Sequence, residues 1–171
     1  MDRQEALPTC PECGAVVSGA AAGCQALYDE LQGLIDSDDS FGQYRRVVHD
    51  TYCIQHPTRY IRHRTKALAA HLGGLCWVVE YSGHLIGYQA LQRWLERVPW
   101  HTMPMPRLPG VRSDVTVVSV HRVLQETAEP KQFSRAVERW ACSTWEAYAE
   151  LHPLIRGWIE EALTTRRSHH R

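Results

Sequence analysis

Hydrophobic residues recur at helical spacing along most of this chain. The first such run, over 24–35, contains Leu27, Tyr28, Leu31, Leu34 and Ile35. Because an α-helix has 3.6 residues per turn, these side chains share one face of an amphipathic helix. The same period continues over about 41–56, 62–81, 84–98, 120–128 and 130–165. The pattern predicts an all-α fold, a single helical bundle of about six helices.

Prolines and glycines mark where these helices end. Pro57 disfavours the helical conformation of the residue before it, so we expect the second helix to end at His56. Pro153 lies inside the last run and should kink or split that helix. Several prolines predict a long loop over 99–114. The first 23 residues are expected to be irregular because they contain five helix breakers: Pro8, Pro11, Gly14, Gly19 and Gly23.

The composition fits one globular domain. The chain has 171 residues, of which 44% are hydrophobic and 22% charged, and this balance supports a hydrophobic core. We expect residues 1–165 to form a single domain, in which a knuckle-like, cysteine-bearing segment, 1–23, packs on helices within 24–165. Residues 166–171 are expected to form a disordered tail. No apolar run approaches the roughly 20 residues of a transmembrane helix, so no membrane partner is expected.

Net charge and cysteine content indicate which partners and which cellular compartment to expect. Nineteen basic and nineteen acidic residues cancel, so no net field favours nucleic acid. A local basic run, Arg59–Arg64, leaves an RNA-binding zinc module as a weaker alternative. The charged start, Met1–Glu5, lacks the apolar stretch of a secretory signal, which favours the cytoplasm. In that reducing compartment we expect the six cysteines to be buried or metal-bound rather than paired in disulfides.

The N-terminal segment carries a motif typical of zinc sites. Cys10 and Cys13 have C-x-x-C spacing, and Gly14 after them permits the tight turn that brings two thiolates to one ion. Cys24, at the start of the first helix, offers a third thiolate, so a tetrahedral zinc site needs one more ligand. Without metal, the same motif is an inert thiol pair or a redox pair. The redox interpretation requires a βαβ context that the pattern does not predict.

The fourth ligand must come from farther along the chain, since the first helix offers no further cysteine or histidine. His56 is our first choice, because a residue at a helix end can reach the N-terminal segment. His49, Cys53 and His71 are the alternatives. On a straight helix His49 and His56 cannot share an ion, because seven residues span roughly 10 Å. Cys53 has suitable spacing to either histidine, although a lone helical cysteine is more often a core residue.

Three further residues suggest a second, open metal site inside the bundle. Asp50, His71 and His152 lie on three predicted helices, and bundle cores commonly hold metal sites. In this hypothesis they are the catalytic residues and hold an ion or an activated water, as Lewis acid or general base. In the alternative, each histidine is partly buried and hydrogen-bonded to a backbone carbonyl. Asp50 is also placed to orient a ligand histidine.

Several motifs together resemble a bacterial family of domain-of-unknown-function proteins. They are C-P-x-C-G, G-C, D-x-Y-x-x-Q-H-P, H-L-x-x-L-C-x-x-x-E and W-x-x-Y-x-x-x-H with I-R-x-W, at Cys10–Gly14, Gly23-Cys24, Asp50–Pro57, His71–Glu80 and Trp145–Trp158. The resemblance implies a cytoplasmic metal-binding protein and no particular activity. It places His56, His71 and His152 on motif positions and leaves His49 outside them.

These features predict a zinc-binding helical protein that binds a partner or a small molecule. Cys10, Cys13, Cys24 and His56 would hold the zinc, and four protein ligands leave no position for a reacting water. The alternative is a small metalloenzyme that uses the open Asp/His site. The chain has no Gly-rich phosphate loop, no dinucleotide fingerprint and no H-E-x-x-H motif. Their absence argues against P-loop hydrolysis, Rossmann redox chemistry and zincin proteolysis.

Overall fold

The computed structural model describes residues 7–62, 64–83, 85–103, 105–109, 118–127 and 129–167. Within these ranges the protein is all-α, with eight α-helices, six of them at least seven residues long, and no β-strand. The helices are α1 (Ala20–Ser37), α2 (Arg45–Gln55), α3 (Pro57–Tyr60), α4 (Thr65–Tyr81), α5 (Leu85–Arg97), α6 (Val120–Leu124), α7 (Pro130–Ala147) and α8 (His152–Arg167). Short 3₁₀ turns are η1 (Gly42–Tyr44), η2 (Trp100–Thr102) and η3 (Ala149–Leu151).

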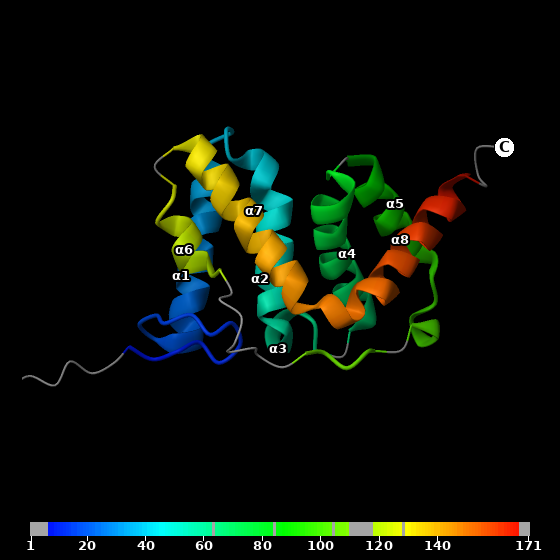
Figure 1. The fold of residues 1–171 in the computed structure, drawn as a ribbon, viewed down its shortest axis with the longest axis horizontal. Coiled ribbons are helices and arrows are strands. Elements are labelled where there is room, and N and C mark those ends of the chain that lie inside the picture. The colour runs from blue at the N-terminus through cyan, green and yellow to red at the C-terminus, as the bar shows by residue number, and fades with distance from the viewer. Residues whose placement is uncertain are drawn as a thin grey trace, which may run out of the picture.

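Helix α2 lies in the middle of the bundle (Figure 1). It packs against α4 and α7, and α4 in turn packs against α5, α7 and α8. Helix α1 contacts α2 and α6, at the end of the molecule where the N-terminal segment lies. The chain therefore brings residues of the N-terminal segment, α1, α2 and α4 close together although they are distant in sequence.

The prediction of an all-α single domain is confirmed, with differences at helix ends. The last predicted helix is divided into α7 and α8, with η3 between them. Pro153 is the second residue of α8, where its missing N–H costs no helical hydrogen bond. Helix α8 extends to Arg167, so the first two residues of the predicted tail are helical. Residues 168–171 of that tail lie outside the described part of the chain.

The core is built from the predicted apolar stripes and from tryptophans of α7. Trp140 and Trp145 are fully buried. Trp140 Nε1 donates a 2.8 Å hydrogen bond to Gln55 Oε1, and Gln55 Nε2 donates one of 2.8 Å to the carbonyl oxygen of Val118. Because a buried polar group needs a partner, this chain of bonds fixes how α2, α7 and the segment before α6 meet.

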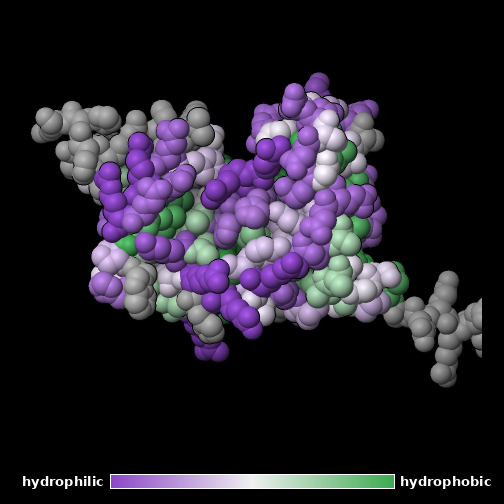
Figure 2. Space-filling model, turned by 180° about the vertical axis from the view of Figure 1, so that it is seen from behind, coloured by the Kyte–Doolittle hydropathy of each residue, from purple (hydrophilic) through white to green (hydrophobic). Residues whose placement is uncertain are grey.

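Many side chains on one face of the molecule are hydrophilic. Figure 2 shows hydrophilic residues across the face opposite to that of Figure 1, with hydrophobic residues between them and at the edge. In the part of the chain that the structure describes, none of the helices combines the length and the apolar character needed to cross a membrane.

An ion pair between α4 and α8 should make stability depend on pH. Glu80 accepts hydrogen bonds of 2.8 and 2.7 Å from Arg156 and one of 3.0 Å from Trp145 Nε1. The bonds from Arg156 lower the pKa of Glu80 below its usual value. Because the folded-state pKa is the lower one, ionised Glu80 stabilises the fold above its unfolded-state pKa. This stabilisation is lost as the pH falls through the folded-state pKa.

We therefore expect Glu80→Gln to lower the melting temperature at neutral pH. The difference from the parent protein should shrink as the pH falls and Glu80 becomes protonated. Thermal unfolding followed by circular dichroism between about pH 3 and pH 7 measures this. Glu30→Gln, at an exposed position of α1, is the control. A Glu80→Gln effect that does not change with pH would show that the carboxylate charge is unimportant.

Candidate metal centre

The N-terminal segment folds into a tight turn that presents two cysteines. Thr9 and Val16 form an isolated antiparallel bridge. Inside it, the Cys10 N–H donates to the Ala15 carbonyl at 2.8 Å, and the Gly14 N–H donates to the Cys10 carbonyl at 2.9 Å. Gly14 has φ +76°, a left-handed conformation that favours glycine. The C-P-x-C-G motif therefore forms a closed turn that carries both thiols.

The third cysteine comes from the first turn and a half of α1. Gly23, just before it, is packed so closely that a Cβ atom there would lie 1.7 Å from the Ser18 carbonyl oxygen. Only glycine allows the helix to begin this close to the preceding segment. As a result Cys24 is fully buried, with its Sγ 3.6 Å from that of Cys13.

The fourth group is His56, the residue that follows the last helical residue of α2. Its Nδ1–H donates a 2.8 Å hydrogen bond to the Tyr52 carbonyl oxygen. This bond leaves the lone pair of Nε2 free, and Nε2 lies 3.7 Å from Cys10 Sγ and 3.3 Å from Cys24 Sγ. The histidine is therefore in the tautomer and orientation of a metal ligand.

These four side chains, the Cys3His cluster, fit the requirements of a metal ion. Their ligand atoms all lie within 4.8 Å of one another. Tetrahedral zinc with usual bond lengths places sulfur and nitrogen ligands about 3.6 Å apart and two sulfurs about 3.8 Å apart. The nitrogen–sulfur distances of 3.7 and 3.3 Å and the sulfur–sulfur distance of 3.6 Å between Cys13 and Cys24 are close to these values. Cys10, Cys13, Cys24 and His56 thus lie close enough together to hold a metal ion.

Electrostatics within the cluster favour a cation. The hydrogen bond between the sulfurs of Cys13 and Cys24 lowers the pKa of Cys13 to about 4. The same contact, together with burial, raises the pKa of Cys24. Burial also raises the pKa of Cys10. Three neighbouring thiolates in a buried space repel one another, and a divalent cation bound between them would offset that repulsion.

Two contacts support this cluster from outside. Glu12, inside the C-x-x-C turn, accepts a 2.8 Å hydrogen bond from the backbone N–H of Thr58 in α3. The ring of Tyr52 stacks on that of His56, with centroids 3.9 Å apart. The first contact holds the turn against α3, and the second restrains the ring of His56.

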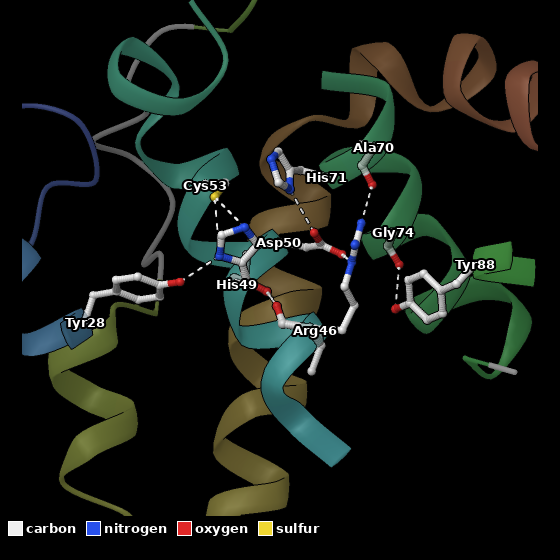
Figure 3. A network of polar contacts seen from close by, with 11 residues as sticks. Tyr28, Arg46, His49, Asp50, Cys53, Ala70, His71, Gly74 and Tyr88 are labelled. Carbon is white, nitrogen blue, oxygen red and sulfur yellow. Dashed lines mark hydrogen bonds and ion pairs between the residues drawn. The ribbon is translucent and has the colours of Figure 1, made fainter. Parts of the chain in front are cut away.

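The alternatives considered for the fourth ligand form a cluster of their own. His49, Cys53 and His71, the His2Cys cluster, have ligand atoms within 4.8 Å of one another. His49 Nε2 lies 3.6 Å from Cys53 Sγ, and its ring centroid is 5.2 Å from that of His71. Tyr28 contributes a hydroxyl 2.7 Å from His49 Nδ1 (Figure 3).

Asp50 is the central carboxylate beside this second cluster. It is fully buried and accepts hydrogen bonds of 2.8 Å from His71 Nδ1–H and 2.7 Å from Arg46 Nε–H. The guanidinium of Arg46 also lies over the ring of Tyr88, 5.5 Å from its centroid. Gly74 on α4 makes room for the carboxylate, since a Cβ atom there would lie 2.1 Å from Asp50 Oδ2. Figure 3 shows these residues as one network across α1, α2, α4 and α5.

The structure brings together two of the three residues predicted to be catalytic. Asp50 and His71 are in direct contact, whereas His152 is in neither group of potential metal ligands. The His152 ring stacks on Trp145 with centroids 3.7 Å apart, and its Nε2–H donates to the Trp145 carbonyl at 3.0 Å. This hydrogen bond matches the alternative predicted from the sequence, in which the histidine is bonded to a backbone carbonyl. A catalytic role for any of the three stays a prediction.

Sequence reasoning gave no site role to Tyr28, Arg46 or Tyr88, which all belong to the second network. Tyr28 follows the hydrophobic stripe of α1 and gave no separate polar signal. Arg46 lies four residues before Asp50, a spacing typical of helical ion pairs, which could have identified it. The spacing of His49 and Cys53 allowed a shared ion, but no local pattern indicated that α4 would bring His71 to them.

The close approach at Gly74 gives a test of the second network. We expect Gly74→Ala to destabilise the protein by roughly 1–3 kcal/mol, because the added methyl group must displace the buried carboxylate of Asp50. Gly157→Ala on α8 is the matched control, since its Cβ atom would meet nothing within 4 Å. That control should be neutral or stabilising by up to about 1 kcal/mol through helix propensity. Urea unfolding measures both, and equal effects would contradict the tight packing at Gly74.

A family model described as "Family of unknown function (DUF5946)" matches residues 8–149. That range contains both clusters of potential metal ligands and ends before His152. Comparison with curated proteins and with solved structures gave no match. Because the family model covers most of the chain, this protein belongs to the DUF5946 family of unknown function.

Proposed function

We propose that this protein binds zinc through Cys10, Cys13, Cys24 and His56, and that the ion fastens the N-terminal segment to the helical bundle. The observation that carries the proposal is the convergence of three thiols on His56 Nε2, while Nδ1 of the same ring is already hydrogen-bonded. Three sulfur ligands and one imidazole favour zinc among the divalent ions. Four protein ligands leave no open position, so the ion has a structural role.

The fold explains why such an ion is useful here. Residues 8–17 have little regular structure beyond one bridge, and four of them, Cys10, Cys13, Ala15 and Val17, are buried. One ion ligated by the N-terminal turn, α1 and the end of α2 cross-links three parts of the chain. Zinc sites of this kind contribute folding free energy directly. A reducing compartment such as the cytoplasm keeps thiols available for metal, and all six cysteines are free.

The rest of the bundle supports a binding role for this zinc-stabilised fold. A pocket of about 610 Å³ lies between α2, α4 and α5 and is lined by Arg46, Ala70, Tyr88, Leu91, Gln92 and Leu95, among others. Its volume is in the range of small-molecule sites, which bury an apolar ligand and orient it with a few polar groups. We propose that the protein acts by binding a small molecule or a partner rather than by chemistry at the Cys3His cluster.

The test is metal analysis of the purified chain and of Cys10→Ser/Cys13→Ser. We expect the double variant to contain one zinc ion fewer per chain than the parent, because two of four ligands are lost. Its free energy of unfolding should fall by about 4 kcal/mol if free zinc is about 1,000 times its dissociation constant. Elemental analysis and urea unfolding measure the two effects.

Cys142→Ser is the matched control, because this thiol is free and exposed. It should leave zinc content and stability unchanged. A Cys10→Ser/Cys13→Ser protein with the same zinc content and the same unfolding curve as the parent would overturn the proposal.

A further inference from the structure

The His2Cys cluster has a donor set suited to a metal ion. It combines two imidazoles and one thiol, drawn from α2 and α4, with ligand atoms within 4.8 Å of one another. The 3.6 Å separation of His49 Nε2 and Cys53 Sγ equals the distance of about 3.6 Å expected between nitrogen and sulfur ligands of one tetrahedral zinc ion. Asp50 is not one of the three, because its carboxylate is already held by His71 and Arg46.

A hydrogen bond at Nδ1 of each histidine leaves Nε2 of the same ring available to an ion. His71 donates from Nδ1 to Asp50 at 2.8 Å, which leaves its Nε2 lone pair free. Nδ1 of His49 lies 2.7 Å from the Tyr28 hydroxyl, so it is Nε2 that remains available beside Cys53. Ligand histidines in proteins almost always have such a partner, most often a carboxylate or carbonyl. Both histidines of the cluster therefore have a hydrogen-bond partner on one ring nitrogen, as ligand histidines usually do.

The supporting carboxylate is fixed on its other side as well. Arg46 binds the second oxygen of Asp50 at 2.7 Å, and Gly74 provides the space in which the carboxylate sits. A fully buried carboxylate held in this way leaves the His71 ring little freedom to change its orientation. An ion pair of Asp50 with His71 and Arg46 would by itself account for the positions of those two side chains. It does not require the ligand atoms of His49 and Cys53 to lie within 4.8 Å of that of His71.

The cluster is also accessible and separate from the first. The His71 side chain is 16% exposed, so an ion and a further ligand can reach it from solvent. Tyr52 lies between the two clusters, stacked on His56 on one side and on Tyr28 on the other, each at 3.9 Å between centroids. The two groups therefore belong to different sites.

We infer that His49, Cys53 and His71 form a second binding site for a divalent transition-metal ion such as zinc. The fourth coordination position is open to water or a small anion, and Asp50 acts as a positioning residue for His71. Three protein ligands with an open position are the arrangement of catalytic rather than structural zinc sites. This inference does not depend on the Cys3His cluster holding zinc.

The experiment is a cobalt(II) titration of the metal-free full-length chain under reducing conditions, with bound cobalt counted per chain. We expect two ions in the parent protein. Cys53→Ala and His71→Ala should each bind one ion fewer, whereas Cys10→Ser/Cys13→Ser should retain the ion at the second site. Cys76→Ala is the matched control, because Cys76 is equally buried and lies outside both clusters.

The number of cobalt ions bound per chain of the parent protein tests the second site even if a variant fails to fold. One bound cobalt ion at saturation, lost in Cys10→Ser/Cys13→Ser, would overturn the second site and support the first. One ion that survives Cys10→Ser/Cys13→Ser and is lost in Cys53→Ala would support the second site and overturn the first. Two ions that both persist in folded Cys53→Ala would also overturn the inference.

Two further measurements test the open position and the role of Asp50. Azide should shift the visible spectrum of the cobalt ion at the second site, and an unchanged spectrum would contradict the open position. Asp50→Asn should weaken cobalt binding there by about 10- to 100-fold. It should leave the Cys3His affinity unchanged. An equal loss at both sites would mean that Asp50 supports the fold rather than the metal.

Discussion

The burial of helix α2 is the constraint on which the rest of the structure depends. Eight of its eleven residues are buried, because α4, α7 and α1 cover it. A helix enclosed in this way has few alternative positions, since close-packed interiors tolerate little displacement. His49, Asp50 and Cys53 project from this helix, and His56 follows its last residue. The geometry of both clusters is therefore fixed by the packing that buries α2.

The two clusters use this helix differently. At its C-terminal end, His56 meets sulfurs from a segment that has little regular structure, and a metal ion there would supply a cross-link. In the middle of the helix, His49 and Cys53 meet His71 from another well-packed helix. The second cluster can therefore form without metal, and a bound ion there would be available for ligand binding. An ion at the Cys3His cluster would stabilise the fold, whereas an ion at the His2Cys cluster would be available to bind a ligand.

The sequence predicted the parts of the site that depend on local geometry. The C-x-x-C turn, the position of Cys24 on a helix and His56 before Pro57 all follow from backbone preferences of neighbouring residues. The helix of Cys24 nevertheless begins at Ala20, within the segment predicted to be irregular. The helices followed from hydrophobic periodicity in the same way. The position of His71 beside His49 and Cys53 could not be predicted, because it depends on which face of α4 packs on α2. That choice is set by contacts such as the one between Gly74 and Asp50, which join residues distant in sequence.

We expect a metal ion at the Cys3His cluster to hold the N-terminal turn in place. Hydrogen–deuterium exchange of the zinc-loaded and chelator-treated chain measures this at the amides of Cys10 and Gly14, which donate within the turn. Removing zinc should speed exchange at both amides by at least about tenfold, with little change in α7. Unchanged exchange at Cys10 and Gly14 after zinc removal would contradict it.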